Sequence, residues 1–344
     1  MNRSTVSHND VQDYYGKTLQ SSSDLQSNCC TASEPADHIK KIIGEIEDEV
    51  LDRFYGCGSP IPESLEGLTV LDLGCGTGRD CYILSKLVGE NGRVIGVDMT
   101  DEQLDVARRN QDKMAENFGY EKSNVEFIKA IIEDLSAIVD ASVDLVISNC
   151  VINLSTHKEK VFSEIFRVLK PGGELYFSDV YSDRRIPQHL RDDTVFYGEC
   201  LGGALYYEDF RRMMMDIGCL DHRIVSKSVI DLNNKEIEEK AGNIVFYTIT
   251  VRAFKLDSLE DECEDYGQVA IYKGDITHAE NTFILDDHHQ FEAGRPMLVC
   301  GNTAAMLEET RFATHFQIIG DRSTHFGIFD CSNDVETEAG GSCC

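Results

Sequence analysis

The chain has 344 residues, of which 42% are hydrophobic and 27% are charged, so it can form about two soluble domains with buried cores. Its formal net charge of -29 argues against a nucleic acid partner, because no basic patch could offset so strong a repulsion from phosphates. The first residues lack the apolar core of a signal peptide, and no run of about 18 uncharged apolar residues occurs. We therefore expect a cytoplasmic protein with no membrane partner.

The N-terminal part of the chain predicts a loop followed by a helix. Residues 1–36 are polar and are expected to be flexible, with the adjacent Cys29 and Cys30 within them. Residues 36–53 carry isoleucine and valine at helical spacing, which predicts an amphipathic helix. Two glycines and a proline interrupt that pattern around Cys57, which is expected in a loop before the first strand.

Residues 70–79, VLDLGCGTGR, predict a buried strand, a tight glycine turn and the start of a helix. Glycines let the backbone approach a ligand closely, and the free amides of a helix N-terminus offer hydrogen bonds. A dinucleotide fingerprint requires a glycine where Arg79 stands, so a nicotinamide cofactor is disfavoured. The next predicted strand ends in Asp98, where a carboxylate would accept hydrogen bonds from both ribose hydroxyls.

Strands and helices then alternate, which predicts an α/β fold with a doubly wound, mostly parallel sheet. The expected helices cover residues 80–88, 101–117, 157–169 and 209–217. Seven strands are expected, over residues 70–73, 93–97, 125–129, 143–148, 174–180, 222–230 and 244–254. This domain spans residues 37–255. Residues 256–335 predict a small C-terminal α+β domain with a helix at 303–309, and residues 336–344 a disordered tail that holds Cys343 and Cys344.

The pattern D-x-G-x-G-x-G from Asp72, followed by an acid at the end of the next strand, resembles the class I S-adenosylmethionine-dependent methyltransferases. That resemblance implies a Rossmann-like domain with S-adenosylmethionine as cofactor. This cofactor carries no phosphate, which agrees with the absence of a lysine from the turn. We expect the cofactor to contact Tyr55, Asp72, Gly74, Cys75, Gly76, Thr77, Gly78, Asp98, Met99, Glu133 and Asn149.

The chain contains 13 cysteines, but no C-x-x-C pair, so zinc-ribbon and thioredoxin-type sites lack their signature. Cys150 and Cys200 follow the fourth and fifth predicted strands, and the carboxyl ends of parallel strands are where ligands bind. Cys30 and Cys57 belong to segments free to fold over the same edge. We expect only a packing role for Cys81, Cys219, Cys263, Cys300 and Cys331.

The chain resembles one family, the arsenic(III) methyltransferases, in the segments YYGCG, DLGCGTGRDCY, SNCVINL, GGELYFSDVY and GECLGGALY. The resemblance extends from about Val11 to the cysteine-bearing tail. It implies that trivalent arsenicals are substrates, that thiol reductants such as glutathione or a thioredoxin-type protein are partners, and that Cys30 (or Cys29), Cys57, Cys150 and Cys200 bind arsenic.

Three thiolates leave trivalent arsenic with a lone pair, which is the nucleophile, so the reaction needs positioning of two bound reactants and no general base. Tyr55, Tyr14 or Tyr15 are candidates for an aromatic face against the sulfonium, and Glu133 for the adenine amino group. Monomethylarsenite has one position occupied by carbon and takes only two thiolates. We therefore expect Cys150 and Cys200 to serve both steps, and Cys30 and Cys57 to be needed for arsenite alone.

Two alternatives remain open. A methyltransferase for a small oxygen, nitrogen or carbon nucleophile would need a general base, for which His189 is a candidate. A thiol-based metalloid binder without activity would explain the cysteines but not the cofactor cradle. We expect a monomer.

Overall fold

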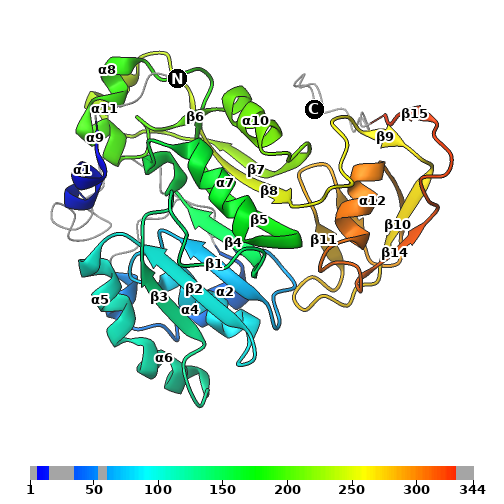
Figure 1. Cartoon of the computed structure of the whole chain (residues 1–344), viewed down its shortest axis with the longest axis horizontal. Helices are drawn as coiled ribbons and strands as arrows, with labels where there is room; N and C mark the ends of the chain where they lie inside the picture. The colour runs from blue at the N-terminus through cyan, green and yellow to red at the C-terminus, as the bar shows by residue number, and fades with distance from the viewer. Residues whose placement is uncertain (1–5, 15–34, 53–59, 331–344) are drawn as a thin grey trace.

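The computed structural model describes residues 6–14, 35–52 and 60–330 (Figure 1). Within the segment expected to be a loop, residues His8–Asp13 form helix α1, whose N-terminus is capped by Ser7 and Asp10. The helix predicted over residues 36–53 is two helices, α2 (Asp37–Ile43) and α3 (Asp48–Leu51). Gly44 caps α2, so the apolar stripe of Ile39, Ile42 and Val50 continues across a turn.

The central sheet has the strand order β3-β2-β1-β4-β5-β8-β7. These seven strands correspond to the seven predicted ones, and a short strand that the sequence analysis did not predict, β6, pairs with β5. All neighbours are parallel except β5 with β8 and β8 with β7. Their bounds are β1 Thr69–Leu73, β2 Arg93–Asp98, β3 Val125–Lys129, β4 Val143–Asn149, β5 Leu169–Ser182, β6 Leu205–Tyr206, β7 His222–Val229 and β8 Phe246–Phe254.

Helices cover both faces of the sheet, because residues of one strand alternate between two apolar cores. In β1, Val70 packs into one core together with α2, α4 and α5, whereas Leu71 and Leu73 pack into the other together with α7 and α10. The bounds of the helices in this domain are α4 Arg79–Val88, α5 Asp101–Arg109, α6 Gln111–Phe118, α7 Lys158–Val168, α8 Gln188–Arg191, α9 Thr194–Gly198, α10 Tyr207–Asp216 and α11 Lys235–Ala241.

Two further differences from the prediction concern the helices after β2. The helix predicted over residues 101–117 is interrupted at Asn110, whose side-chain amide donates to the carbonyl of Val106 at 2.9 Å and so competes with the backbone. The short helices α8, α9 and α11 were not predicted, because four to seven residues carry too little periodicity to distinguish them from loops.

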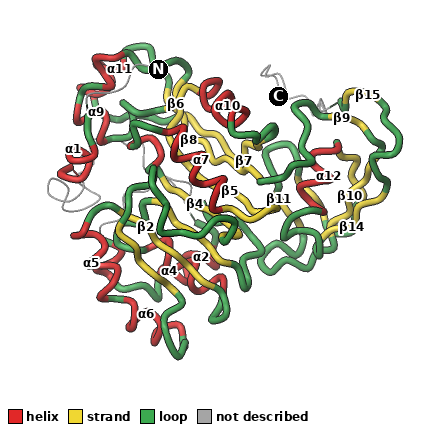
Figure 2. The backbone as a smooth tube through the Cα atoms, viewed as in Figure 1, coloured by secondary structure: helices red, strands yellow, loops and turns green. Residues whose placement is uncertain are grey.

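The C-terminal residues form a smaller domain around a separate apolar core that includes Phe254, Tyr272 and Phe312. Figure 2 shows its described residues as strands and loops around helix α12, at one end of the large sheet. Its strands form a three-stranded sheet of order β13-β10-β14 and two separate pairs, β11 with β12 and β15 with β9. The elements are β9 Glu264–Asp265, β10 Gln268–Tyr272, β11 Thr282–Ile284, β12 Gln290–Glu292, β13 Pro296–Val299, α12 Gly301–Glu308, β14 Phe316–Ile319 and β15 Gly327–Ile328.

Ionic contacts in a buried region join the two domains. Glu174 in β5 accepts a hydrogen bond of 2.7 Å from Arg252 in β8 and also pairs with Arg311, which lies beyond α12. Arg252 in turn donates to the carbonyls of Ile284 and Leu285. Glu174 lies near the start of β5, so the C-terminal domain packs at the end of the sheet opposite the carboxyl ends of the parallel strands.

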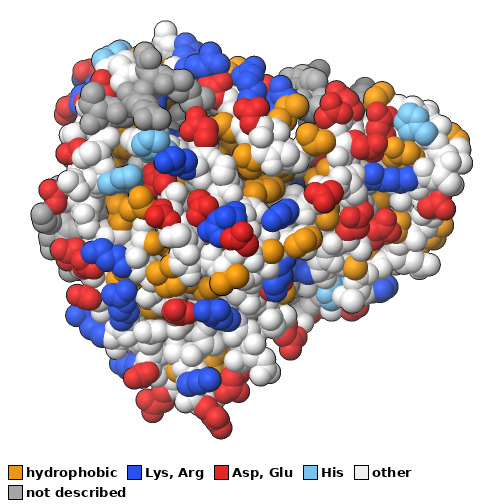
Figure 3. Space-filling model, viewed as in Figure 1, with side chains coloured by type: hydrophobic (Ala, Val, Ile, Leu, Met, Phe, Trp, Pro, Cys, Tyr) orange, Lys and Arg blue, Asp and Glu red, His pale blue; other side chains and the backbone are white. Residues whose placement is uncertain are grey.

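The surface is mixed in charge. On the face shown in Figure 3, lysine and arginine side chains lie among aspartate and glutamate instead of gathering into a basic stripe. No helix in the described part of the chain combines the length and the apolar character that crossing a bilayer requires.

Candidate active site

A pocket lies beyond the carboxyl ends of β1, β2 and β4, and the glycine turn forms its floor. Gly74, Gly76 and Gly78 have φ angles of 71°, 53° and 87°, a region that other residues rarely adopt. A Cβ on Gly74 would lie 2.4 Å from Val151, and one on Gly78 would lie 2.7 Å from Phe127. The turn therefore requires glycine for both its backbone angles and its close packing against Val151 and Phe127.

Asp98 at the end of β2 stabilises the turn and also lines the pocket. Its two carboxylate oxygens accept hydrogen bonds from the backbone N–H of Gly76, at 3.0 Å, and of Thr100, at 2.8 Å. Burial raises the pKa of Asp98, and these backbone hydrogen bonds oppose that rise. The residue thus lies where the sequence placed a ribose acceptor, with part of its hydrogen-bonding capacity used within the protein.

Further acidic groups lie under the turn. Burial, together with the charge of Asp80, raises the pKa of Asp72 well above its usual value. The Asp80 carboxylate accepts hydrogen bonds from Arg79, at 3.0 Å, and from the Asn149 amide, at 3.1 Å. Asp80 connects the turn to β4, which carries Asn149 at its end. The pocket is also lined by four residues that were not predicted, Arg79, Asp80, Thr100 and Gln103. They follow the glycine turn or the second strand, and this position was the available signal.

The remaining predicted cofactor residues in the described chain differ in position. Cys75 and Met99 line the pocket, and burial raises the pKa of the Cys75 thiol to about 11, so the thiol is protonated at neutral pH. Thr77 also lines the pocket, but its hydroxyl donates to the carbonyl of Val50 at 2.7 Å. Tyr55 lies outside the described residues.

Helix α1 lies at the opposite wall of the pocket, to which His8 and Val11 contribute. His8 Nε2 is 2.9 Å from the Glu133 carboxylate, which also accepts a hydrogen bond from Ser155. Burial opposes ionisation of Glu133, but the hydrogen bonds from Ser155 and His8 outweigh it and lower the pKa. Glu133 is therefore a pocket residue that already has two protein partners.

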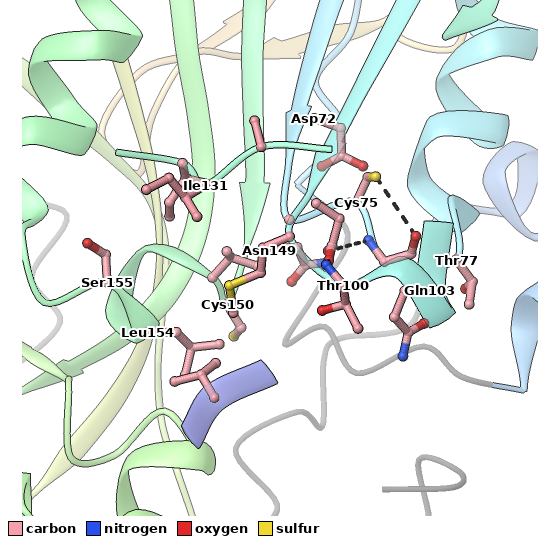
Figure 4. Close-up of a pocket in the computed structure, with 18 of the residues that line it drawn as sticks. Asp72, Cys75, Thr77, Thr100, Gln103, Ile131, Asn149, Cys150, Leu154 and Ser155 are labelled. Carbon is pink, nitrogen blue, oxygen red and sulfur yellow. Dashed lines mark hydrogen bonds between the residues drawn. The ribbon is translucent and has the colours of Figure 1, made fainter. Parts of the chain in front are cut away.

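Cys150 lies on the pocket wall directly after β4, and Figure 4 shows it between the glycine turn on one side and Leu154 and Ser155 on the other. Cys200 lies behind it, and its thiol donates to the Cys150 carbonyl at 3.2 Å. Both are buried and have positive φ angles, 57° and 63°, which are strained in residues with a Cβ. Cys150 is disulfide-bonded, whereas Cys200 forms no disulfide.

Buried charges fix the segment between Cys150 and α7. Asp179 in β5 accepts the backbone N–H of Asn153 at 3.1 Å, and Lys158 donates to the carbonyls of Asn153 and Ser155. Burial raises the pKa of Asp179 to about 7 and lowers that of Lys158 to about 8. The sequence analysis did not predict this pair, because its two members come from different elements.

Several other candidates lie elsewhere. Tyr14 donates to Glu199 at 2.7 Å and packs on Gly198, beside Cys200, but it is not among the pocket-lining residues. His189, the base considered for a different substrate, is an exposed residue of α8 and does not line the pocket. Cys29, Cys30, Cys57 and Tyr15 lie outside the described residues.

Two family models match the chain. A methyltransferase domain matches residues 64–270, and an arsenite methyltransferase C-terminal domain matches residues 265–340. The chain is 51% identical to an arsenite methyltransferase of Aquipseudomonas alcaligenes, over 98% of this chain and 100% of that protein. It is 44% identical to the arsenite methyltransferase of Homo sapiens, over 91% of this chain and 84% of that protein.

A solved structure is similar over most of the fold. The crystal structure of an arsenic(III) S-adenosylmethionine methyltransferase from Chlamydomonas reinhardtii superposes with a TM-score of 0.84 at 51% identity. The match covers 86% of this chain and 100% of that one. The likeness thus extends over both the large sheet and the C-terminal domain.

Proposed function

The chain belongs to the arsenite methyltransferase family, and from this premise we propose that it methylates thiol-bound trivalent arsenic, first arsenite and then monomethylarsenite. It is an S-adenosylmethionine-dependent methyltransferase of class EC 2.1.1. The observation that carries the finer proposal is the position of Cys150, on the wall of the cofactor pocket and in contact with Cys200. Arsenic held there lies next to the cofactor.

The pocket residues fit S-adenosylmethionine. The glycine turn leaves a cradle that a Cβ on Gly74 would disturb, and the wall carries the carboxylates of Asp72, Asp80, Asp98 and Glu133. These groups suit ribose hydroxyls, an amine and a cationic sulfonium, whereas Arg79, which also lines the pocket, is paired with Asp80. When bound, the cofactor supplies an electrophilic methyl group.

The protein's part in the reaction is to hold arsenic with its lone pair towards that methyl group. Thiolates are the ligands that a soft, trivalent metalloid prefers, and arsenite exchanges up to three hydroxyls for sulfur. Cys150 directly follows β4 and Cys200 follows α9, and the strained backbone of both residues is a form of preorganisation. No base is required, because arsenic loses no proton when its lone pair reacts.

The disulfide at Cys150 supports a role for thiol reductants, glutathione or a thioredoxin-type protein, in renewing the arsenic-binding thiol. We propose that the enzyme serves arsenic detoxification as a cytoplasmic monomer that binds no nucleic acid, which agrees with its net charge of -29. We also propose residues 37–255 as the cofactor and arsenic domain, because β8 ends at Phe254, and residues 256–335 as the C-terminal domain. Residues 1–36, which include α1, and residues 336–344 remain proposed as an N-terminal segment and a tail outside these domains.

The test is to assay single cysteine variants against arsenite and against trivalent monomethylarsenic, with cofactor and thiol in excess. Cys150→Ser and Cys200→Ser should abolish methylation of both substrates. Cys57→Ser and Cys30→Ser should lose methylation of arsenite and keep that of monomethylarsenic, because two thiolates suffice for the second substrate. If Cys29 is the ligand instead, Cys29→Ser should show this selective loss and Cys30→Ser should not. Cys219→Ser, which removes a buried free thiol away from the pocket, is the control.

Equal loss on both substrates for Cys57→Ser would overturn the assignment of two thiols to the second step. Full activity of Cys150→Ser would indicate that the substrate is instead a small oxygen, nitrogen or carbon nucleophile. Calorimetric titration with S-adenosylmethionine distinguishes the enzyme from a metalloid binder without activity, which would not bind the cofactor.

A further inference from the structure

Two cysteines of the C-terminal domain form a thiol pair remote from the pocket. Cys263 directly precedes β9, and Cys300 is the N-cap of α12. Figure 1 places α12 and β9 on the side of the molecule away from α1, which lies at the pocket. The sequence analysis expected both cysteines only to fill space, and their contacts indicate otherwise.

Cys300 is surrounded by hydrogen-bond donors. Its sulfur accepts from the backbone N–H of Thr303, at 3.4 Å, and lies 3.3 Å from the Thr303 hydroxyl. The Arg223 guanidinium of β7 donates to it at 3.8 Å, and the Cys263 thiol is a further donor. The segments that carry the two cysteines lie side by side, because the Asn302 side chain donates to the Glu260 carbonyl at 2.8 Å and accepts from the Glu260 backbone N–H at 2.8 Å.

These contacts change the ionisation of the thiol. The hydrogen bond from Cys263, followed by the charge of Arg223 and the bonds from Thr303, outweighs burial and lowers the pKa of Cys300 to about 5. In Cys219, which is buried without comparable donors, burial raises the pKa to about 12. These contacts favour the thiolate of Cys300, the form that binds soft metals and metalloids.

The pair offers two sulfur ligands and is accessible from one side. Cys300 is only 1% exposed, but Cys263 is half-buried and gives access from solvent. Within the described residues, the one group of three close metal-binding side chains is Asp286, Asp287 and His288, which does not include either cysteine. A structural zinc ion requires about four ligands, whereas a trivalent arsenical with one carbon substituent requires two thiolates.

We propose that Cys263 and Cys300 form a second arsenical site, which binds monosubstituted trivalent arsenicals in a two-sulfur ring. The proposal rests on the proposed function for its natural ligand, monomethylarsenite. In the exchange, R–As(OH)2 reacts with the Cys263 thiol, the Cys300 thiolate and one proton. The products are two water molecules and an R–As group bonded to both sulfurs. No oxidant or reductant takes part. The site retains the product of the first methylation on the enzyme, remote from the cofactor.

The test uses the full-length protein, reduced and then treated with phenylarsine oxide, a monosubstituted trivalent arsenical. Native digestion and mass spectrometry should find the peptides of Cys263 and Cys300 joined through one phenylarsenic group. Cys263→Ser and Cys300→Asp should each bind one phenylarsenic group fewer than the wild type. Cys300→Asp keeps an anionic N-cap beside Arg223, so it preserves the fold while removing the sulfur. Cys219→Ser should bind as many groups as the wild type.

Thermal unfolding of each variant checks that a lost group does not reflect a lost fold. Identical binding by wild type and both variants, or a wild-type digest without the joined peptides, would overturn the proposal. Arsenite methylation assayed on the same wild-type sample separates the two claims. Methylation without the joined peptides rejects the second site alone, and joined peptides without methylation reject the proposed function alone.

Discussion

Asp98 has two roles, because its carboxylate holds the backbone of Gly76 and Thr100 and also faces the cofactor pocket. We predict that Asp98→Ala weakens S-adenosylmethionine binding by about 1.5 to 3 kcal/mol, the range for losing hydrogen bonds to a charged group. Calorimetry measures the effect, and arsenite binding should persist. Asp101→Ala, which removes an exposed carboxylate paired with Lys129, should leave cofactor affinity unchanged. An unaltered affinity in Asp98→Ala would exclude this carboxylate from the ribose site.

His222 determines part of the acid sensitivity. The ring packs against Phe210 and lies 3.1 Å from the Tyr207 hydroxyl, and burial lowers its pKa to about 4. Below about pH 6.5 the unfolded chain binds a proton that the folded protein takes up only near pH 4. This residue therefore contributes stability that is complete above pH 6.5 and declines as pH falls towards 4, by at most about 3 kcal/mol.

Denaturant unfolding of the wild type and His222→Gln between pH 7 and pH 4 measures this contribution, since glutamine cannot take up the proton. The loss of unfolding free energy should be smaller in the variant by up to about 3 kcal/mol. Parallel pH profiles for the two proteins would contradict the assignment.

At the scale of elements, the turn from β1 to α4 connects the cofactor pocket to Cys150, one of the proposed arsenic ligands. Gly74 has a φ of 71°, and its missing side chain leaves room for Val151, the neighbour of Cys150. Gly74→Ala should cost about 2 to 5 kcal/mol of unfolding free energy, from backbone strain and overpacking together. It should also weaken cofactor binding and methyl transfer, because Val151 must move and displace Cys150.

Gly119 provides the matched control for that substitution. It has a similar φ of 79° in the left-handed region, but a Cβ there meets no atom within 4 Å. Gly119→Ala should therefore cost only the backbone strain, about 1 to 2 kcal/mol, with full cofactor affinity. If both variants lose equal stability and both bind the cofactor normally, contact with Val151 does not position the arsenic site.

For the whole molecule, the charged cluster of Glu174, Arg252 and Arg311 joins the two domains. Glu174 and Arg252 are both fully buried, so removing the carboxylate leaves guanidinium charge without its partner in a low-dielectric region. Glu174→Gln should reduce the free energy of unfolding by about 3 to 5 kcal/mol, as measured with denaturant. Glu126→Gln, which breaks the exposed pair with Arg93, should change it by less than about 1 kcal/mol. A small effect of Glu174→Gln would mean that the domains are held by apolar packing.

The local features of this protein were determined by its sequence. The strand order of the sheet is a tertiary property, but its members were predicted because short apolar runs that end at turn residues, such as residues 70–73 before Gly74, are typical of buried strands. Gly74 and Gly78 were identifiable because only glycine adopts their backbone angles easily. Family membership was visible from the same short segments and is supported by relatives over the whole chain. Cys30, Cys57 and Tyr55 remain predictions.

Contacts between distant residues were decided by the tertiary structure alone. Cys150 and Cys200 are 50 residues apart in sequence, and only the folded sheet edge brings the thiol of one to the carbonyl of the other. The lowered pKa of Cys300 depends on the hydrogen bond from Cys263 and on the charge of Arg223, both distant in sequence, so no local pattern could distinguish Cys300 from an inert cysteine. Periodicity and backbone preference act between neighbours along the chain, whereas ionisation and ligand geometry depend on groups that only folding brings together.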